Sequence, residues 1–210
     1  MKTILFQGDS ITYSNRSFDT ECLSGSGYVT ITSGSITSKE PGKYKVLNRG
    51  IGGNRVVDLY ARWKKDCISL KPDIISILIG VNDVWHEVES GNGVDAENFK
   101  KIYNMLIADT LKALPNCKMV LLEPFVWKYG LTVEHWSYIK SEVEKRGEIA
   151  KELAKNYNIP FIALQSVFDD ALEKAPAEFW TLDGIHPLAS GHMLIANEWE
   201  KCFYNNELWL

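Results

Sequence analysis

The chain has 210 residues, of which 45% are hydrophobic and 24% charged, and its formal net charge is −4. This composition is typical of a folded globular protein, and the length is enough for one domain with a single core. The acidic balance argues against a nucleic-acid partner, because contacts to phosphate backbones need clustered positive charge. We therefore predict a single domain over residues 1–210 that does not bind nucleic acid.

The sequence also carries no signal for a membrane, a metal or a secretory route. The start, MKTILFQGD, lacks the apolar core of a signal peptide, and no apolar run is long enough to cross a bilayer. Four widely spaced cysteines form no Cys-x-x-Cys pair: Cys22, Cys67, Cys117 and Cys202. Zinc-ligand spacing and a disulfide framework are therefore unsupported. We expect a cytoplasmic protein with reduced thiols and no membrane partner.

Five short apolar runs, rich in Ile, Val and Leu and bounded by Gly, Pro or Asn, are spread along the chain. In chain order they cover residues 3–7, 44–49, 73–80, 118–124 and 159–164. Runs of this length and composition are typical of strands that are buried on both faces of a parallel sheet.

Longer stretches between and after these runs have helical periodicity. In 96–114, 134–157 and 188–204, apolar residues recur at steps of three and four. Segment 27–41 contains β-branched residues that favour strand. We nevertheless predict a helix there, because parallel neighbours need a crossover connection. The alternation predicts a three-layer α/β/α sandwich with a five-stranded and mostly parallel sheet.

Four polar segments follow the carboxyl ends of predicted strands. They contain Ser10, the NRGIGGN turn (48–54), the GVND turn (80–83) and the EPFVW segment (123–127). In open α/β sheets, ligands bind beyond the carboxyl ends of the strands. The sequence therefore predicts one site where these segments meet.

A serine at this edge could act as a nucleophile if a base and an acid are available. Histidine is the natural base, and Asp183 stands three residues before His186, so its carboxylate could reach Nδ1 and leave Nε2 for Ser10. The other histidines are His86, His135 and His192. Each motif alone also suits a structural role, since Gly-Asp-Ser favours turns and Asp-Gly-Ile-His-Pro favours a helix cap.

Acyl transfer also needs hydrogen-bond donors for a developing oxyanion. Asn82 offers a side-chain amide just past the third strand, and Gly53 offers an N–H that a substrate could approach closely. Taken singly, both residues also suit ordinary turn chemistry.

Together these residues resemble the four sequence blocks of the GDSL esterases, also called SGNH hydrolases. The blocks are FQGDSIT (6–12), LNRGIGGN (47–54), LIGVND (78–83) and DGIHPLASGH (183–192). They occur in family order, and the resemblance runs from residue 4 to about residue 199. It implies the flavodoxin-like SGNH hydrolase fold and a serine esterase that needs no cofactor and no metal.

The resemblance implies roles for five residues. Ser10 matches the nucleophile, His186 the general base and acid, and Asp183 the carboxylate that orients this histidine. The implied oxyanion hole consists of the N–H groups of Ser10 and Gly53 and the side chain of Asn82.

Further details of the blocks refine this assignment. The family glycine usually falls five residues after Asn48, which favours Gly53 over Gly52. Asp9 resembles a structural acid of the family rather than a catalytic one. Position 12 is Thr12, so the Gly-x-Ser-x-Gly elbow of the α/β-hydrolases is absent.

The substrate is less well defined by the sequence. Three tryptophans near the predicted site are expected to bind it, either by stacking on a sugar ring or by lining an acyl or aryl pocket, although packing in the core is the alternative for each: Trp85, Trp127 and Trp180. The short segments at this edge favour a small-molecule ester with a short acyl chain, in particular an acetylated sugar. A lysophospholipase or a thioesterase of the same family is the alternative.

Two other functions use some of the same residues. A metal-dependent phosphoesterase could use four ligands: Asp9, Asp83, Asp183 and His186. A carbohydrate-binding protein without catalysis could keep the fold. At the C-terminus, the apolar residues Leu208, Trp209 and Leu210 are expected to pack on the domain.

Overall fold

The computed structural model describes residues 1–20 and 24–205. Its centre is one five-stranded sheet with the strand order β2-β1-β3-β4-β5, and each of its strand pairs is parallel. The strands are β1 (Lys2–Gly8), β2 (Tyr44–Asn48), β3 (Ile74–Leu78), β4 (Lys118–Leu122) and β5 (Phe161–Ile162). The α/β fold predicted from the sequence is confirmed, and the sheet is fully parallel rather than mostly so. The predicted packing of Leu208, Trp209 and Leu210 lies outside the described residues.

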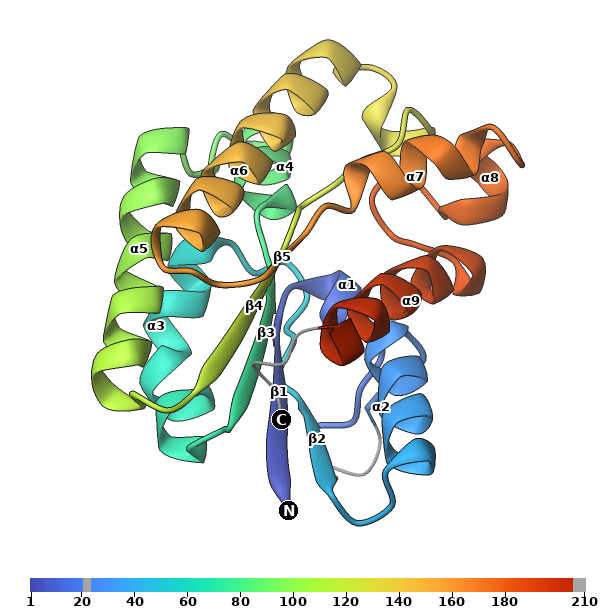
Figure 1. Cartoon of the computed structure of the whole chain (residues 1–210). Helices are drawn as coiled ribbons and strands as arrows, with labels where there is room; N and C mark the ends of the chain where they lie inside the picture. Colours follow the sequence, from blue (N-terminus) through green and yellow to red (C-terminus); the bar gives the residue numbers. More distant parts are fainter. Residues whose placement is uncertain (21–23, 206–210) are drawn as a thin grey trace.

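Helices cover both faces of the sheet (Figure 1). On one face lie α2 (Tyr28–Lys39) and α9 (Ala189–Asn205), and on the other lie α3 (Val56–Asp66) and α5 (Ala96–Ala113). The long helix α6 (Trp136–Asn156) contributes to both cores. The remaining helices are α1 (Ser10–Tyr13), α4 (Val81–Ser90), α7 (Gln165–Leu172) and α8 (Ala177–Trp180), with 3₁₀ turns at Ile68–Leu70 and Gly130–Thr132. No helix of the described part is long and apolar enough to cross a membrane.

The strands form two cores because successive side chains point to opposite faces. On β1, Ile4 and Phe6 pack with α2 and α9, whereas Leu5 packs with α3 and α5. On β3, Ile74 and Ile75 divide in the same way. Burial on both faces explains why the strands appear in the sequence as continuous apolar runs.

The structure confirms helices in all four predicted segments, including 27–41. Helix α2 buries Tyr28, Val29, Thr32 and Ile36, so tertiary packing outweighs the strand preference of its β-branched residues. Helices α3 and α4 were not predicted. The GVND sequence is not a free turn: α4 begins at Val81, directly after Gly80, whose φ of 135° lies in the region that favours glycine.

Candidate active site

The sheet places Ser10 at the carboxyl end of its second strand in spatial order, β1. Ser10 is the first residue of α1, and the carboxylate of Asp9 caps this helix by accepting the N–H of Ile11 at 2.9 Å. The Ser10 side chain is half-buried, and its Oγ lies 2.8 Å from Nε2 of His186. The hydroxyl therefore faces an imidazole supplied by a segment 176 residues further along the chain.

A short turn before α9 orients that imidazole. Oδ2 of Asp183 lies 2.7 Å from Nδ1 of His186, while Oδ1 accepts the backbone N–H groups of Ile185 at 2.9 Å and of His186 at 2.8 Å. Thr181 donates its hydroxyl to the carbonyl of His186 at 2.9 Å. Because α9 begins only at Ala189, Asp183 is not its cap, and the helix-cap interpretation of this motif is wrong.

The charges of this pair are mutually supportive. Burial would raise the pKa of Asp183, but hydrogen bonds from the side chain and N–H of His186 and from the N–H of Ile185 bring it below its ordinary value. The hydrogen bond to Asp183 raises the pKa of His186 above its ordinary value of 6.5, although burial opposes this. The carboxylate thus favours the protonated form of the imidazole.

The turn after β2 lies beside the nucleophile. A Cβ on Gly52 would lie 3.9 Å from Cβ of Ser10, and Gly53 has a φ of 74°, which favours glycine. Asn82 is 5% exposed and uses Nδ2 to donate to the carbonyl of Asn54 at 3.1 Å. This bond uses one of the two amide hydrogens of Asn82 and leaves the second for a ligand.

Backbone donors are also available around this turn. Within residues 1–20 and 24–205, the N–H groups of Ser10, Gly52 and Gly53 have no backbone or side-chain acceptor. Together with the free amide hydrogen of Asn82, they are suitable donors for an oxyanion. The geometry leaves both Gly52 and Gly53 as possible donors.

Two of the carboxylates proposed as metal ligands point into the protein instead. Both oxygens of Asp83 accept the N–H of Val56, at 3.1 and 3.2 Å, and Oδ1 of Asp9 accepts the N–H of Ile11. Burial raises the pKa of each to about 7. Among the described residues, no three His, Cys, Asp or Glu side chains could together hold a metal ion. The structure therefore does not gather the ligands that a metal-dependent phosphoesterase would need.

The structure places Trp127 in the core rather than at the surface of the site. Trp127 is 1% exposed and its ring packs on Phe125 and Phe168, with centroids 5.1 and 4.4 Å apart. This differs from the expected substrate contact, because the segment after β4 turns the indole onto apolar neighbours. Its backbone N–H instead donates to the carbonyl of Gly184 at 2.9 Å and so supports the turn that carries His186. Trp85 is half-buried and packs against the same core.

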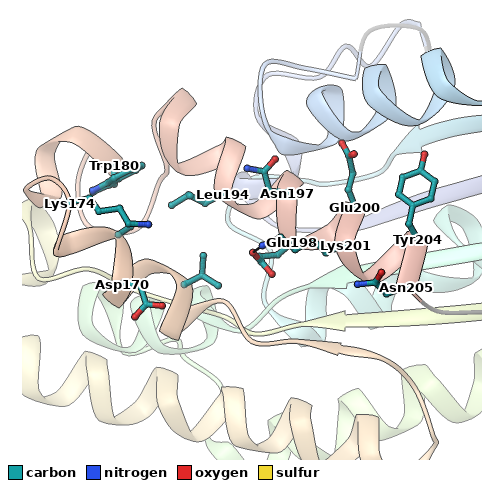
Figure 2. Close-up of a pocket in the computed structure, with 12 residues that line it drawn as sticks. Asp170, Lys174, Trp180, Leu194, Asn197, Glu198, Glu200, Lys201, Tyr204 and Asn205 are labelled. Atoms are coloured by element: carbon teal, nitrogen blue, oxygen red, sulfur yellow. Dashed lines mark hydrogen bonds and ion pairs between the residues drawn. The ribbon is translucent and has the colours of Figure 1, made fainter.

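Trp180 lies in a separate groove between α7, α8 and α9 (Figure 2). Its Nε1 donates to the carbonyl of Ala175 at 3.0 Å. The groove has a volume of about 680 Å³, and Figure 2 shows Trp180 and Lys174 at one end of it and Tyr204 at the other. Ser10, His186 and Asp183 are not among the residues that line this groove.

A hydroxyl, an imidazole and a carboxylate in hydrogen-bonded series, beside unused N–H donors, define the class of hydrolases that act through a serine. The sequence pattern of the GDSL-like lipase/acylhydrolase family matches residues 6–194. The chain therefore belongs to this family and is a carboxylic ester hydrolase. Membership in this family argues against the alternative of a carbohydrate-binding protein without catalysis.

Known relatives agree with this assignment over almost the whole chain. An acetylxylan esterase from Geobacillus stearothermophilus is 30% identical over 202 residues, which cover 92% of this chain and 90% of that protein. The crystal structure of a Parabacteroides merdae protein assigned as a GDSL-like lipase has a TM-score of 0.91 at 38% identity, and the match covers 96% and 94% of the two chains. A catalytic mutant of the Geobacillus esterase has a TM-score of 0.86 at 30% identity, with 96% and 93% covered.

Proposed function

We propose that this chain hydrolyses short-chain esters, with acetyl groups on carbohydrates as its natural substrates, and that Ser10 carries the acyl group between the two half-reactions. The observation that carries this proposal is the series from Ser10 Oγ to His186 Nε2, at 2.8 Å, and from His186 Nδ1 to Asp183 Oδ2, at 2.7 Å. The likeness to an acetylxylan esterase over 92% of the chain supports acetylated carbohydrate as the substrate. We also propose a cytoplasmic location, which the buried free thiols of Cys67 and Cys117 support.

In the first half-reaction, Oγ of Ser10 attacks the acyl carbon while Nε2 of His186 removes the hydroxyl proton. The bond to the leaving alcohol breaks as His186 returns this proton to the alcohol oxygen. In the second half-reaction, His186 deprotonates a water molecule, which attacks the acyl carbon of the acyl-Ser10 ester. The bond between this carbon and Oγ then breaks, the proton returns to Oγ, and the carboxylic acid leaves. Asp183 keeps Nδ1 protonated throughout, so that Nε2 can accept.

Each tetrahedral intermediate places a negative charge on the former carbonyl oxygen. The N–H groups of Ser10 and Gly53 and the second amide hydrogen of Asn82 would donate to this oxygen. These donors are fixed before the substrate arrives, because Asn54 holds the Asn82 amide and α1 holds Ser10. Fixed donors stabilise the developing charge without reorganisation during the reaction.

Replacing Asn82 with alanine is expected to lower kcat by roughly 10²–10³, which is the usual effect of losing one oxyanion donor. The KM should change little, since the bond strengthens as charge develops. Steady-state rates on p-nitrophenyl acetate measure this, with Asn98→Ala on the exposed start of α5 as the control. A kcat for Asn82→Ala within threefold of wild type would remove Asn82 from the oxyanion hole.

A chain-length series tests the substrate class. On p-nitrophenyl acetate, butyrate and octanoate, we expect kcat/KM to be highest for acetate and at least about tenfold lower for octanoate. A single methylene changes discrimination by about 1–3 kcal/mol, and octanoate has six more methylenes than acetate to accommodate. The natural reaction is tested by acetate release from acetylated xylooligosaccharides. Preference for octanoate, with no acetate released from the oligosaccharides, would instead favour a lysophospholipase or a thioesterase.

A further inference from the structure

Helix α4 brings a second histidine to the turn that carries the proposed oxyanion donor. His86 stands four residues after Asn82, so the two side chains lie on the same side of α4. A Cβ on Gly53 would lie 3.8 Å from Nε2 and 3.9 Å from Cε1 of His86. The imidazole edge therefore faces Gly53 directly, while the preceding residue, Gly52, faces Ser10.

Ser10 and His86 thus lie on either side of one short turn. The Cα atoms of Gly52 and Gly53 are separated by one peptide unit, about 3.8 Å. A carbohydrate whose acetyl carbon is held at Ser10 extends beyond the acetyl group by at least one ring, and such a ring is large enough to cross this turn. His86 is then within reach of the substrate without being part of the triad.

The imidazole of His86 is available for a ligand. Its side chain is half-buried, and within residues 1–20 and 24–205 neither ring nitrogen has a hydrogen bond. The contrast with the other two histidines near the site is clear, because both nitrogens of His186 are used and Nδ1 of His192 accepts the N–H of Tyr28 at 3.2 Å. A neutral imidazole offers one donor and one acceptor, which matches a sugar hydroxyl.

The position of His86 is fixed by contacts that do not involve its ring. Asp83, on the first turn of α4, accepts the N–H of Val56 at the start of α3. Nη1 of Arg55 donates to the carbonyl of Asn92 just beyond α4 at 2.6 Å. These bonds tie both ends of α4 to the start of α3, so the backbone that carries His86 keeps its place beside the Gly52–Gly53 turn before a substrate binds.

We propose that His86 is a specificity residue that hydrogen-bonds a hydroxyl on the alcohol half of the ester, the carbohydrate, next to the scissile acetyl group. The acetyl group cannot satisfy His86, because its one polar atom, the carbonyl oxygen, is turned toward the oxyanion donors. This inference rests on the proposed function, since a leaving alcohol without hydroxyl groups has nothing to offer His86.

The test compares two substrates that form the same acetyl-enzyme. Acetylated xylooligosaccharides carry hydroxyls on the leaving alcohol, whereas the p-nitrophenol leaving group of p-nitrophenyl acetate carries none for His86. We expect His86→Ala to lower the ratio of kcat/KM values, oligosaccharide over p-nitrophenyl acetate, by about tenfold, which is the effect of one lost hydrogen bond. His86→Gln, which keeps a donor and an acceptor, should recover part of this loss. Glu89→Ala, on the exposed side of the same helix, should keep the wild-type ratio.

Two outcomes would overturn the role of His86, and they differ from failure of the proposed function. A ratio of kcat/KM values in His86→Ala within twofold of wild type would show that the imidazole does not hydrogen-bond the alcohol half of the substrate. A ratio in His86→Gln as low as in His86→Ala would also contradict a hydrogen-bonding role. If the wild-type enzyme hydrolyses p-nitrophenyl acetate but releases no acetate from the oligosaccharides, the proposed carbohydrate function is wrong, and this inference fails with it.

Discussion

The variant Ser10→Ala is expected to lose activity on p-nitrophenyl acetate by about 10⁴-fold or more in kcat/KM. Its Oγ is the atom 2.8 Å from Nε2 of His186, so alanine removes both the bond-forming oxygen and the proton that the histidine takes. The residual rate would come from the oxyanion donors and from substrate binding alone. Initial rates over a range of substrate concentrations measure the effect.

The fold of this variant should be intact. Ser10 caps no helix itself, because Asp9 provides the cap of α1, and its only side-chain hydrogen bond within the described residues is to His186. We expect the thermal unfolding midpoint to stay within a few degrees of wild type. Ser38→Ala, on the exposed end of α2, is the matched control and should keep full activity. Full activity in Ser10→Ala would mean that another group attacks the ester.

The variant Asp183→Asn is expected to lower kcat by about 10⁴-fold. The asparagine amide would donate to Nδ1 of His186, which places the remaining proton on Nε2 and prevents it from accepting the Ser10 proton. The substitution is conservative for the fold, because Oδ1 can still accept the N–H groups of Ile185 and His186. Kinetics on p-nitrophenyl acetate, with the unfolding midpoint as the control, test this prediction.

The pH dependence of kcat/KM shows whether Asp183→Asn acts through His186 or through a general loss of structure. His186 must be neutral to act as the base, so activity falls as the pH drops through its pKa. In the wild type the hydrogen bond to Asp183 raises this pKa, and the midpoint of the acidic limb should lie above 6.5. In Asp183→Asn that cause is removed while burial still lowers the pKa, so the midpoint should move to lower pH. An unchanged midpoint would contradict the pairing.

The strands and the longer helices could be predicted because burial leaves a strong pattern in the sequence. Each strand is buried on both faces, and α5, α6 and α9 repeat apolar residues at helical steps. Helix α4 was not predicted because its first turn, Val81 to Asp83, belongs to the GVND motif, whose polar residues are typical of a turn. A strand prediction for α2 would have been wrong, since the crossover requirement outweighs local propensity there.

The residues of the proposed triad could be identified because their motifs follow strand ends or lie within one short turn. Asp183 and His186 are three residues apart, and the parallel sheet brings Ser10 to the same edge. The burial of Trp127 could not be predicted from the sequence. The sequence shows that an aromatic residue follows β4, but the direction of its side chain depends on the path of the chain after the strand. The role of His86 was missed for a related reason: its spacing of four from Asn82 has meaning only once α4 is known to be a helix.

Covalent labelling with a fluorophosphonate tests the central claim most directly. This reagent reacts with a serine that is activated by a neighbouring base. Water does not release the resulting phosphonyl group from the serine on the assay timescale. We predict that one equivalent inactivates the enzyme, that peptide mapping finds the phosphonyl group on Ser10, and that Asp183→Asn is labelled far more slowly. Label on another residue, or inactivation with Ser10 unmodified, would contradict catalysis by Ser10.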